Sequence, residues 1–265
     1  MPVIPGLGWT FDTVADTYAK LRPGYVDALY RDLLEYKVID ESSFAVEIGI
    51  GGGQATQPIL EVGGSVTAVE PGEQFCRLCR EKFAAYPKFS VVTGKFEAVV
   101  FPPESCDLVY SASAFHWVPE EIGYRKVFDI LKSGGAFARF ANHPWRDKSN
   151  PALAAALDEA YAKYYHTYYR SVPKLEDEYT EAQAIRRAEI AAKYGFVDIQ
   201  YRMYRRTRTF SAQEYIMLLG TYSDHIALPE EVCLPFFRAV EEAIEAHGGT
   251  INIYDTIDLQ LARKP

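Results

Sequence analysis

Between residues 44 and 142 the sequence alternates short β-rich runs with amphipathic stretches. Runs rich in β-branched and aromatic residues predict five strands, at 44–50, 65–70, 89–93, 107–111 and 136–142. Helical periodicity predicts helices between them, at 54–62, 73–86 and 119–132. This alternation requires right-handed crossovers, and it therefore predicts a parallel sheet that helices cover on both faces.

The rhythm changes after residue 142. Helical periodicity recurs at 151–169, 181–194, 211–220 and 229–247, and strand signal returns at 196–209 and 251–262. We therefore expect an α/β protein with a Rossmann-like, doubly wound, mostly parallel seven-stranded sheet and an inserted helical cap.

Three parts of the chain are expected. Residues 1–142 would form an N-terminal helix and the nucleotide-binding core, and residues 143–194 the helical cap. Residues 195–265 would return to the core sheet, with a further helical insertion at 211–247. The cap would then lie beside the strand ends, where open α/β sheets bind ligands.

Charge narrows the choice of partners. The chain has 36 acidic and 28 basic residues, a formal net charge of −8, whereas binding a phosphate backbone depends on Lys and Arg. One local basic cluster contains Arg202, Arg205, Arg206 and Arg208. Strand alternation separates Arg205 from the other three, so we expect these arginines to form a solvated face. The alternative is that one of them binds an anionic acceptor.

Targeting and metal signals are weak. The first ten residues lack a signal-peptide pattern, and no apolar run reaches the roughly 18 residues of a membrane span, so we expect a cytoplasmic protein that does not engage membranes. Cys76 and Cys79 form a lone C-x-x-C. Helical spacing places Cys79 on a packed face, and no second ligand pair follows, so no metal site is expected.

A glycine-rich segment follows the first expected strand. Residues 46–54 read Val-Glu-Ile-Gly-Ile-Gly-Gly-Gly-Gln. The dinucleotide template G-x-G-x-x-G, aligned on Gly49, needs glycine at position 54, where the chain has Gln54. The glycines instead fit E-x-G-x-G-x-G, a turn that brings backbone N–H groups close to a ligand.

A second acid supports a nucleotide site. Glu70 ends the second expected strand, where a carboxylate can accept hydrogen bonds from both hydroxyls of a ribose. The alternative for Glu70 is a solvated side chain at a strand end.

Taken in order, these motifs resemble those of class I methyltransferases that use S-adenosylmethionine (SAM). They resemble in particular the small-molecule branch that includes trans-aconitate methyltransferase-like proteins. The likeness also rests on the segments 68–71, 94–97, 106–109, 114–117 and 131–135, and it covers residues 12–142, with a weaker echo from 195 onward.

The resemblance implies SAM as cofactor, S-adenosylhomocysteine as product, and a small-molecule acceptor on a monomer or homodimer that does not bind nucleic acid. The residues that it places at the cofactor are Tyr18, Arg22, Glu47, Gly49, Ile50, Gly51, Gly53, Glu70, Pro71, Phe96, Glu97, Ser111 and Ala112. In one departure from the family pattern, Lys95 stands where many relatives have an Asp beside the adenine amine.

His116 is the candidate catalytic residue, because it follows the strand end expected to present the methyl group and its ordinary pKa lies near neutrality. The alternative is that His116 only orders its loop. The candidates for the acceptor pocket are Trp117, Trp145, Tyr165, Tyr222 and His225. Tyr165 belongs to an aromatic helix stripe at 161–168, which in most proteins is a packing surface.

Two other functions remain open on sequence alone. One is methylation of RNA or protein, which the acidic charge disfavours. The other is SAM binding without catalysis. A dehydrogenase is disfavoured by Gln54.

Overall fold

A computed structural model describes residues 21–172 and 178–265. Within these ranges one sheet contains seven strands: β1 (Phe44–Ile48), β2 (Ser65–Glu70), β3 (Phe89–Thr93), β4 (Cys106–Ala112), β5 (Leu131–Arg146), β6 (Val197–Ser211) and β7 (Thr250–Arg263). The strand order is β3-β2-β1-β4-β5-β7-β6. The expected Rossmann-like α/β fold with a seven-stranded sheet is therefore confirmed.

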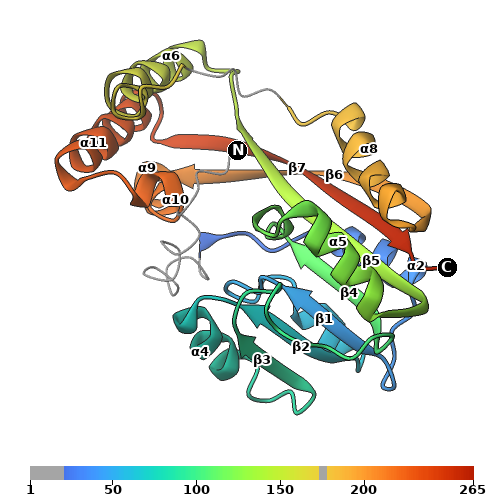
Figure 1. Ribbon diagram of the computed structural model, residues 1–265. Helices are drawn as coiled ribbons and strands as arrows, with labels where there is room; N and C mark the ends of the chain where they lie inside the picture. The colour runs from blue at the N-terminus through green and yellow to red at the C-terminus, as the bar shows by residue number, and fades with distance from the viewer. Residues whose placement is uncertain (1–20, 173–177) are drawn as a thin grey trace.

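The prediction of a mostly parallel sheet was wrong, because the sheet is mixed. Strands β1 to β5 pair in parallel, whereas β7 pairs antiparallel with both β5 and β6. The cause lies in the connection from β6 to β7. The helices between β6 and β7 lie at the end of the sheet where β6 ends (Figure 1). Strand β7 therefore starts at this end and runs antiparallel to β6.

The helical elements of the described residues are α2 (Asp27–Tyr36), α3 (Gln57–Glu61), α4 (Glu73–Lys82), η2 (Phe115–Trp117), α5 (Glu120–Ile130), α6 (Pro151–Ala160), η3 (Tyr161–His166), α7 (Thr167–Tyr169), α8 (Glu181–Glu189), η4 (Ile190–Tyr194), α9 (Ala212–Leu219), α10 (Ser223–Ile226) and α11 (Glu230–Ala246). None of these helices has the length and apolar character needed to cross a membrane. The η3 segment is a single π-helical stretch, a conformation that is rare outside functional or strained regions.

Strand alternation divides the core between the two faces of the sheet. Ala45 and Leu108 face a cluster that includes residues of α2, α3 and α4. Their neighbours Val46 and Val109 face a second cluster with α5 and η4. Because both faces are buried, the central strands are almost continuously apolar, which explains why the sequence signal was clear there.

A third apolar cluster lies beyond the central strands. It joins α6, α9 and α11 to the first residues of β7, with Phe236 and Leu218 fully buried. We call α6, η3, α7, α9, α10 and α11 the helical layer, and Figure 1 shows it at one end of the sheet, beside the long strands β5, β6 and β7. Helix α8 instead packs against β6 and β7.

The arginines of β6 do not form one solvated face. Arg206 and Arg208 both pair with the buried carboxylate of Asp255 on β7, at 2.9 and 2.7 Å. Arg202 and Arg205 are exposed, as expected. The prediction of a solvated face was wrong for Arg206 and Arg208. Their partner Asp255 lies opposite Arg206 on β7, and the sequence of β6 alone does not reveal this pairing.

Candidate active site

The glycine loop follows β1 at the carboxyl end of the sheet. Gly49, Gly51 and Gly53 have φ values of 73°, 52° and 70°, a region that favours glycine. A Cβ atom at Gly49 would lie 2.3 Å from the Cβ of Ala114, so the loop packs directly against the turn that follows β4. A side chain at position 49 would therefore clash with Ala114.

The Glu70 carboxylate fixes the loop to the end of β2. Its Oε2 accepts the N–H of Gly51 and its Oε1 accepts the N–H of Gly72, each at 3.0 Å, and the residue is 8% exposed. Glu70 is therefore not a solvated strand-end residue.

Glu47 lies beneath the loop and is fully buried. Its Oε2 accepts the hydroxyls of Thr56, at 2.7 Å, and Tyr110, at 2.8 Å, while its Oε1 has no partner. Burial, which disfavours the charged form, raises the pKa of Glu47 to about 7 although the two hydroxyls act in the opposite direction. Glu47 therefore connects β1 to Thr56, which follows the loop, and to Tyr110 of β4.

Two side chains of α4 hold the loop from outside. Lys82 Nζ donates to the carbonyls of Gly52 and Gly53, both at 2.9 Å. Cys79 Sγ donates to the carbonyl of Gly51 at 3.1 Å and is fully buried, in agreement with its expected packed position. This role of Lys82 could not be predicted from the sequence, because a lysine on an exposed helix turn carries no local sign of a tertiary partner.

The end of β4 lies next to the loop. The hydroxyl of Ser111 donates to the carbonyl of Ile48 at 2.9 Å and ties β4 to β1. Ser113, the first residue after Ala112, has a φ of 55°, an uncommon value for serine that is often found near functional sites. Its Oγ lies 2.8 Å from the hydroxyl of Tyr25, a residue absent from the sequence-based site.

His116 lies in the short helix η2, directly after this turn. It belongs to the exposed residues, yet desolvation by the surrounding chain, together with the positive charges of Arg187 and Arg139, lowers its pKa to about 4. At neutral pH the ring is therefore uncharged. Its ring centre lies 5.1 Å from that of Trp117.

The remaining expected cofactor residues differ in burial and in contacts. Ile50 and Phe96 are buried, whereas Pro71, Glu97 and Ala112 are partly exposed. Arg22 donates from Nε and Nη2 to Thr221 and stacks on the ring of Tyr222, so it links the N-terminal segment to the helical layer. Tyr18 lies outside the described residues.

The expected acceptor-pocket residues do not converge on one place. Tyr165 and Tyr222 surround His225 in the helical layer, with ring centres 5.1 and 5.6 Å from it. Trp145 instead packs on Tyr254 of β7, and Trp117 lies beside His116. Of the five, only Tyr165, Tyr222 and His225 thus form one cluster.

Comparison with known proteins places this architecture in a family. Residues 46–138 match the methyltransferase domain family. The chain is 32% identical over 165 residues to an uncharacterized methyltransferase of Geobacillus sp. strain WCH70, covering 59% of this chain and 75% of that protein.

Solved structures show the same fold. A candidate type II methyltransferase from Anaeromyxobacter dehalogenans aligns with a TM-score of 0.63 at 21% identity, over 91% of this chain and 97% of that one. Haemonchus contortus phosphoethanolamine N-methyltransferase 2, in complex with phosphomonomethylethanolamine and S-adenosylhomocysteine, aligns with a TM-score of 0.56 at 16% identity, over 100% of this chain and 61% of that one.

The chain therefore belongs to the class I SAM-dependent methyltransferases. Its cofactor is SAM, the compound that this family uses.

The buried Glu47 predicts an unusual pH dependence of stability. Its pKa is about 7 in the folded chain and near 4.5 when unfolded, so the folded state holds more protons between these values. The free energy of unfolding should then fall as the pH rises from about 5 to about 7, by roughly 3 kcal/mol, and level off above.

Urea unfolding of the wild type and Glu47→Gln across this pH range measures the effect. The amide cannot ionise, so the decline should disappear in Glu47→Gln and persist in Glu81→Gln, which changes an exposed residue of α4. An equal decline in the wild type and Glu47→Gln would show that Glu47 does not titrate in this range.

Proposed function

We propose that the chain transfers the methyl group of SAM to a small-molecule acceptor at the carboxyl ends of β1, β2 and β4. The observation that carries the proposal is the Glu70 carboxylate, which ties the glycine loop after β1 to the end of β2, where this fold places an acid that can accept hydrogen bonds from a ribose. In open α/β sheets ligands bind at this edge.

The chain's residues fit the cofactor. Two ribose hydroxyls can donate to the Glu70 carboxylate, and the backbone of Gly49, Gly51 and Gly53, which carries no side chains, permits close approach. Ile50, Pro71, Phe96 and Glu97 would surround the nucleoside; Lys95 is exposed, so backbone beside Phe96 would replace the usual acid. Ser111 and Ala112 would border the methionine part, and Tyr18 and Arg22 would cover it.

When bound, SAM supplies an electrophilic methyl group, so the chain must align the acceptor and exclude water. Ala112 is partly exposed and Ser113 is exposed, and both side chains are small, so an acceptor would have room at this strand end. His116 would border the same space from η2. Because its ring is neutral and its pKa is low, we assign it to positioning rather than to proton removal.

The helical layer would complete the acceptor site. Arg22 joins it, through Thr221 and Tyr222, to the segment leading to Tyr25, whose hydroxyl meets Ser113 at the end of β4. The acidic charge supports a small molecule over a nucleic acid. The motif likeness to trans-aconitate methyltransferase-like proteins supports the same choice.

Loss of the Glu70 carboxylate should weaken cofactor binding. Charge-assisted hydrogen bonds to the ribose are worth roughly 1.5–3 kcal/mol, so Glu70→Ala should bind S-adenosylhomocysteine about 10- to 150-fold more weakly. Calorimetric titration measures this, with circular dichroism to check the fold. Glu81→Ala, on the exposed side of α4, should bind normally. Unchanged affinity in Glu70→Ala would remove Glu70 from the site.

The role of His116 can be read from the rate of methyl transfer. If His116 only positions the acceptor, His116→Asn should lower kcat by no more than about tenfold and leave the shape of the pH profile unchanged. A pKa of about 4 also places any titration of His116 well below neutral pH.

An obligatory base would behave differently. His116→Asn would then lower kcat by roughly 10²–10⁴, and the ascending limb of the wild-type profile would be lost. Both changes together would overturn the positioning role.

A further inference from the structure

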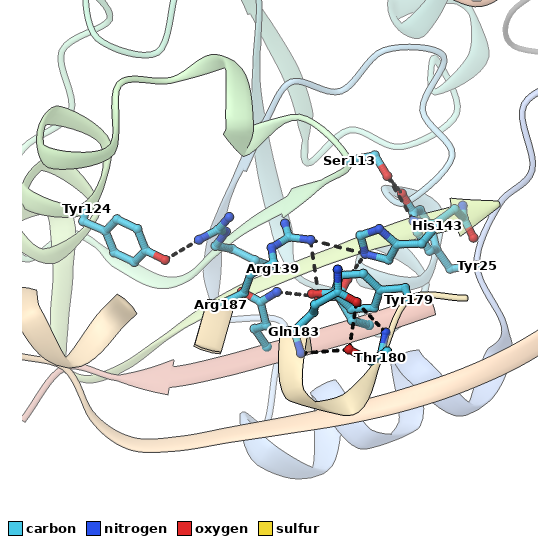
Figure 2. A network of polar contacts seen from close by, with 12 residues as sticks. Tyr25, Ser113, Tyr124, Arg139, His143, Tyr179, Thr180, Gln183 and Arg187 are labelled. Atoms are coloured by element: carbon cyan, nitrogen blue, oxygen red, sulfur yellow. Dashed lines mark hydrogen bonds and ion pairs between the residues drawn. The ribbon is translucent and has the colours of Figure 1, made fainter. Parts of the chain in front are cut away.

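A polar network lies between β5, β7 and α8, on the sheet face that also carries α5 (Figure 2). Arg139 and His143 lie on the same face of β5, four residues apart, and Asp258 of β7 is paired with the residue between them. Arg187 of α8 completes the network. Figure 2 shows the guanidinium groups of Arg139 and Arg187 between Tyr124 and His143.

The network has an excess of positive charge. Arg139 is 9% exposed, donates to the hydroxyl of Tyr124, and leaves its Nε without a partner. Among residues 21–172 and 178–265, no carboxylate lies within ion-pair distance of Arg139, and Arg187 pairs with Asp258 alone. The buried Arg139 thus lacks an ion-pair partner among the described residues, which is costly for a charged group, while Asp258 is in ion-pair contact with Arg187.

Arg187 has donors to spare. His143 Nε2 lies 2.9 Å from Asp258 Oδ1 and 3.2 Å from Arg187 Nη1. One ring nitrogen can donate to Asp258 or accept from Arg187, but it cannot do both. When it donates to Asp258, Arg187 keeps an ion pair to Asp258 Oδ2 at 3.6 Å, beyond hydrogen-bond distance, and a contact with the hydroxyl of Tyr179.

The network also adjoins the candidate active site. The guanidinium carbon of Arg139 lies 4.8 Å from the ring centre of Phe115, which immediately precedes His116. Arg187, Arg139 and His143 are all close enough for their charges to lower the pKa of His116. The side chains of Arg187 and His143 are 29% and 23% exposed, so both can reach a ligand.

We propose that Arg187 forms an oxyanion subsite, which holds a carboxylate or phosphate group of the methyl acceptor beside His116, and that the ring of His143 lines this subsite. Arg139 adds positive charge from behind, and Asp258 orients His143. The guanidinium group can hold such an anion through two parallel hydrogen bonds, and so it would fix the acceptor's orientation relative to the end of β4. This inference rests on the proposed function, because it assigns a substrate class to the same site.

Binding of simple anions to the protein saturated with S-adenosylhomocysteine tests the subsite. Succinate and inorganic phosphate serve as probes for the two anion classes, with succinamide as the neutral control. At least one of the two anions should bind, and Arg187→Gln should weaken that binding about 10- to 100-fold. Arg187→Lys should restore part of it. Arg186→Gln, which changes the exposed neighbour on α8, should match the wild type.

Proton magnetic resonance of His116 adds a readout that does not depend on an acceptor. Arg187→Gln should raise the pKa of His116, because a nearby positive charge is removed, and Arg186→Gln should not. Anion binding to the wild type should raise that pKa as well.

The outcomes separate this proposal from the proposed function. Equal anion binding by wild type and Arg187→Gln, or binding of succinamide as tight as that of succinate, would overturn the subsite even if S-adenosylhomocysteine binds normally. Failure of S-adenosylhomocysteine itself to bind would instead overturn the proposed function.

Discussion

The carboxylate of Glu70 joins the two strand ends on which the site depends. It accepts one N–H from the loop after β1 and one from the turn after β2, and so it holds three left-handed glycines in a single arrangement. Charge-assisted bonds of this kind are about twice as strong as neutral ones. Because Gly49 also packs against Ala114, the position of the β4 turn, and with it that of His116, follows from this anchor.

The sequence predicted the parallel half of the fold well, because the central strands are buried on both faces and three of its crossovers, those through α3, α4 and α5, have a helical period. It failed where pairing is non-local. The antiparallel insertion of β7 between β5 and β6 depends on a connection of about forty residues through helices, and no period in the chain records its direction. The burial of Arg206 and Arg208 had the same cause, since their partner Asp255 comes from β7.

The residues of the candidate site likewise differ in whether their partners are near or distant in the sequence. Glu47, the glycines and Glu70 could be found because they lie on two consecutive strand–turn units with fixed spacing. Lys82, Tyr25 and the network of Arg139, Arg187 and Asp258 could not, because each draws its partner from a distant segment. The proposed oxyanion subsite would draw its residues from β5, α8 and β7, the half of the chain with the weakest motifs.

The central claim is that the glycine loop and Glu70 form a SAM site and not a dinucleotide site. Calorimetric titration of the purified wild-type protein with S-adenosylhomocysteine and, separately, with NAD tests it most directly. S-adenosylhomocysteine should bind saturably and NAD should show no measurable binding, because Gln54 stands where the dinucleotide turn needs glycine. Binding of NAD tighter than that of S-adenosylhomocysteine would contradict it.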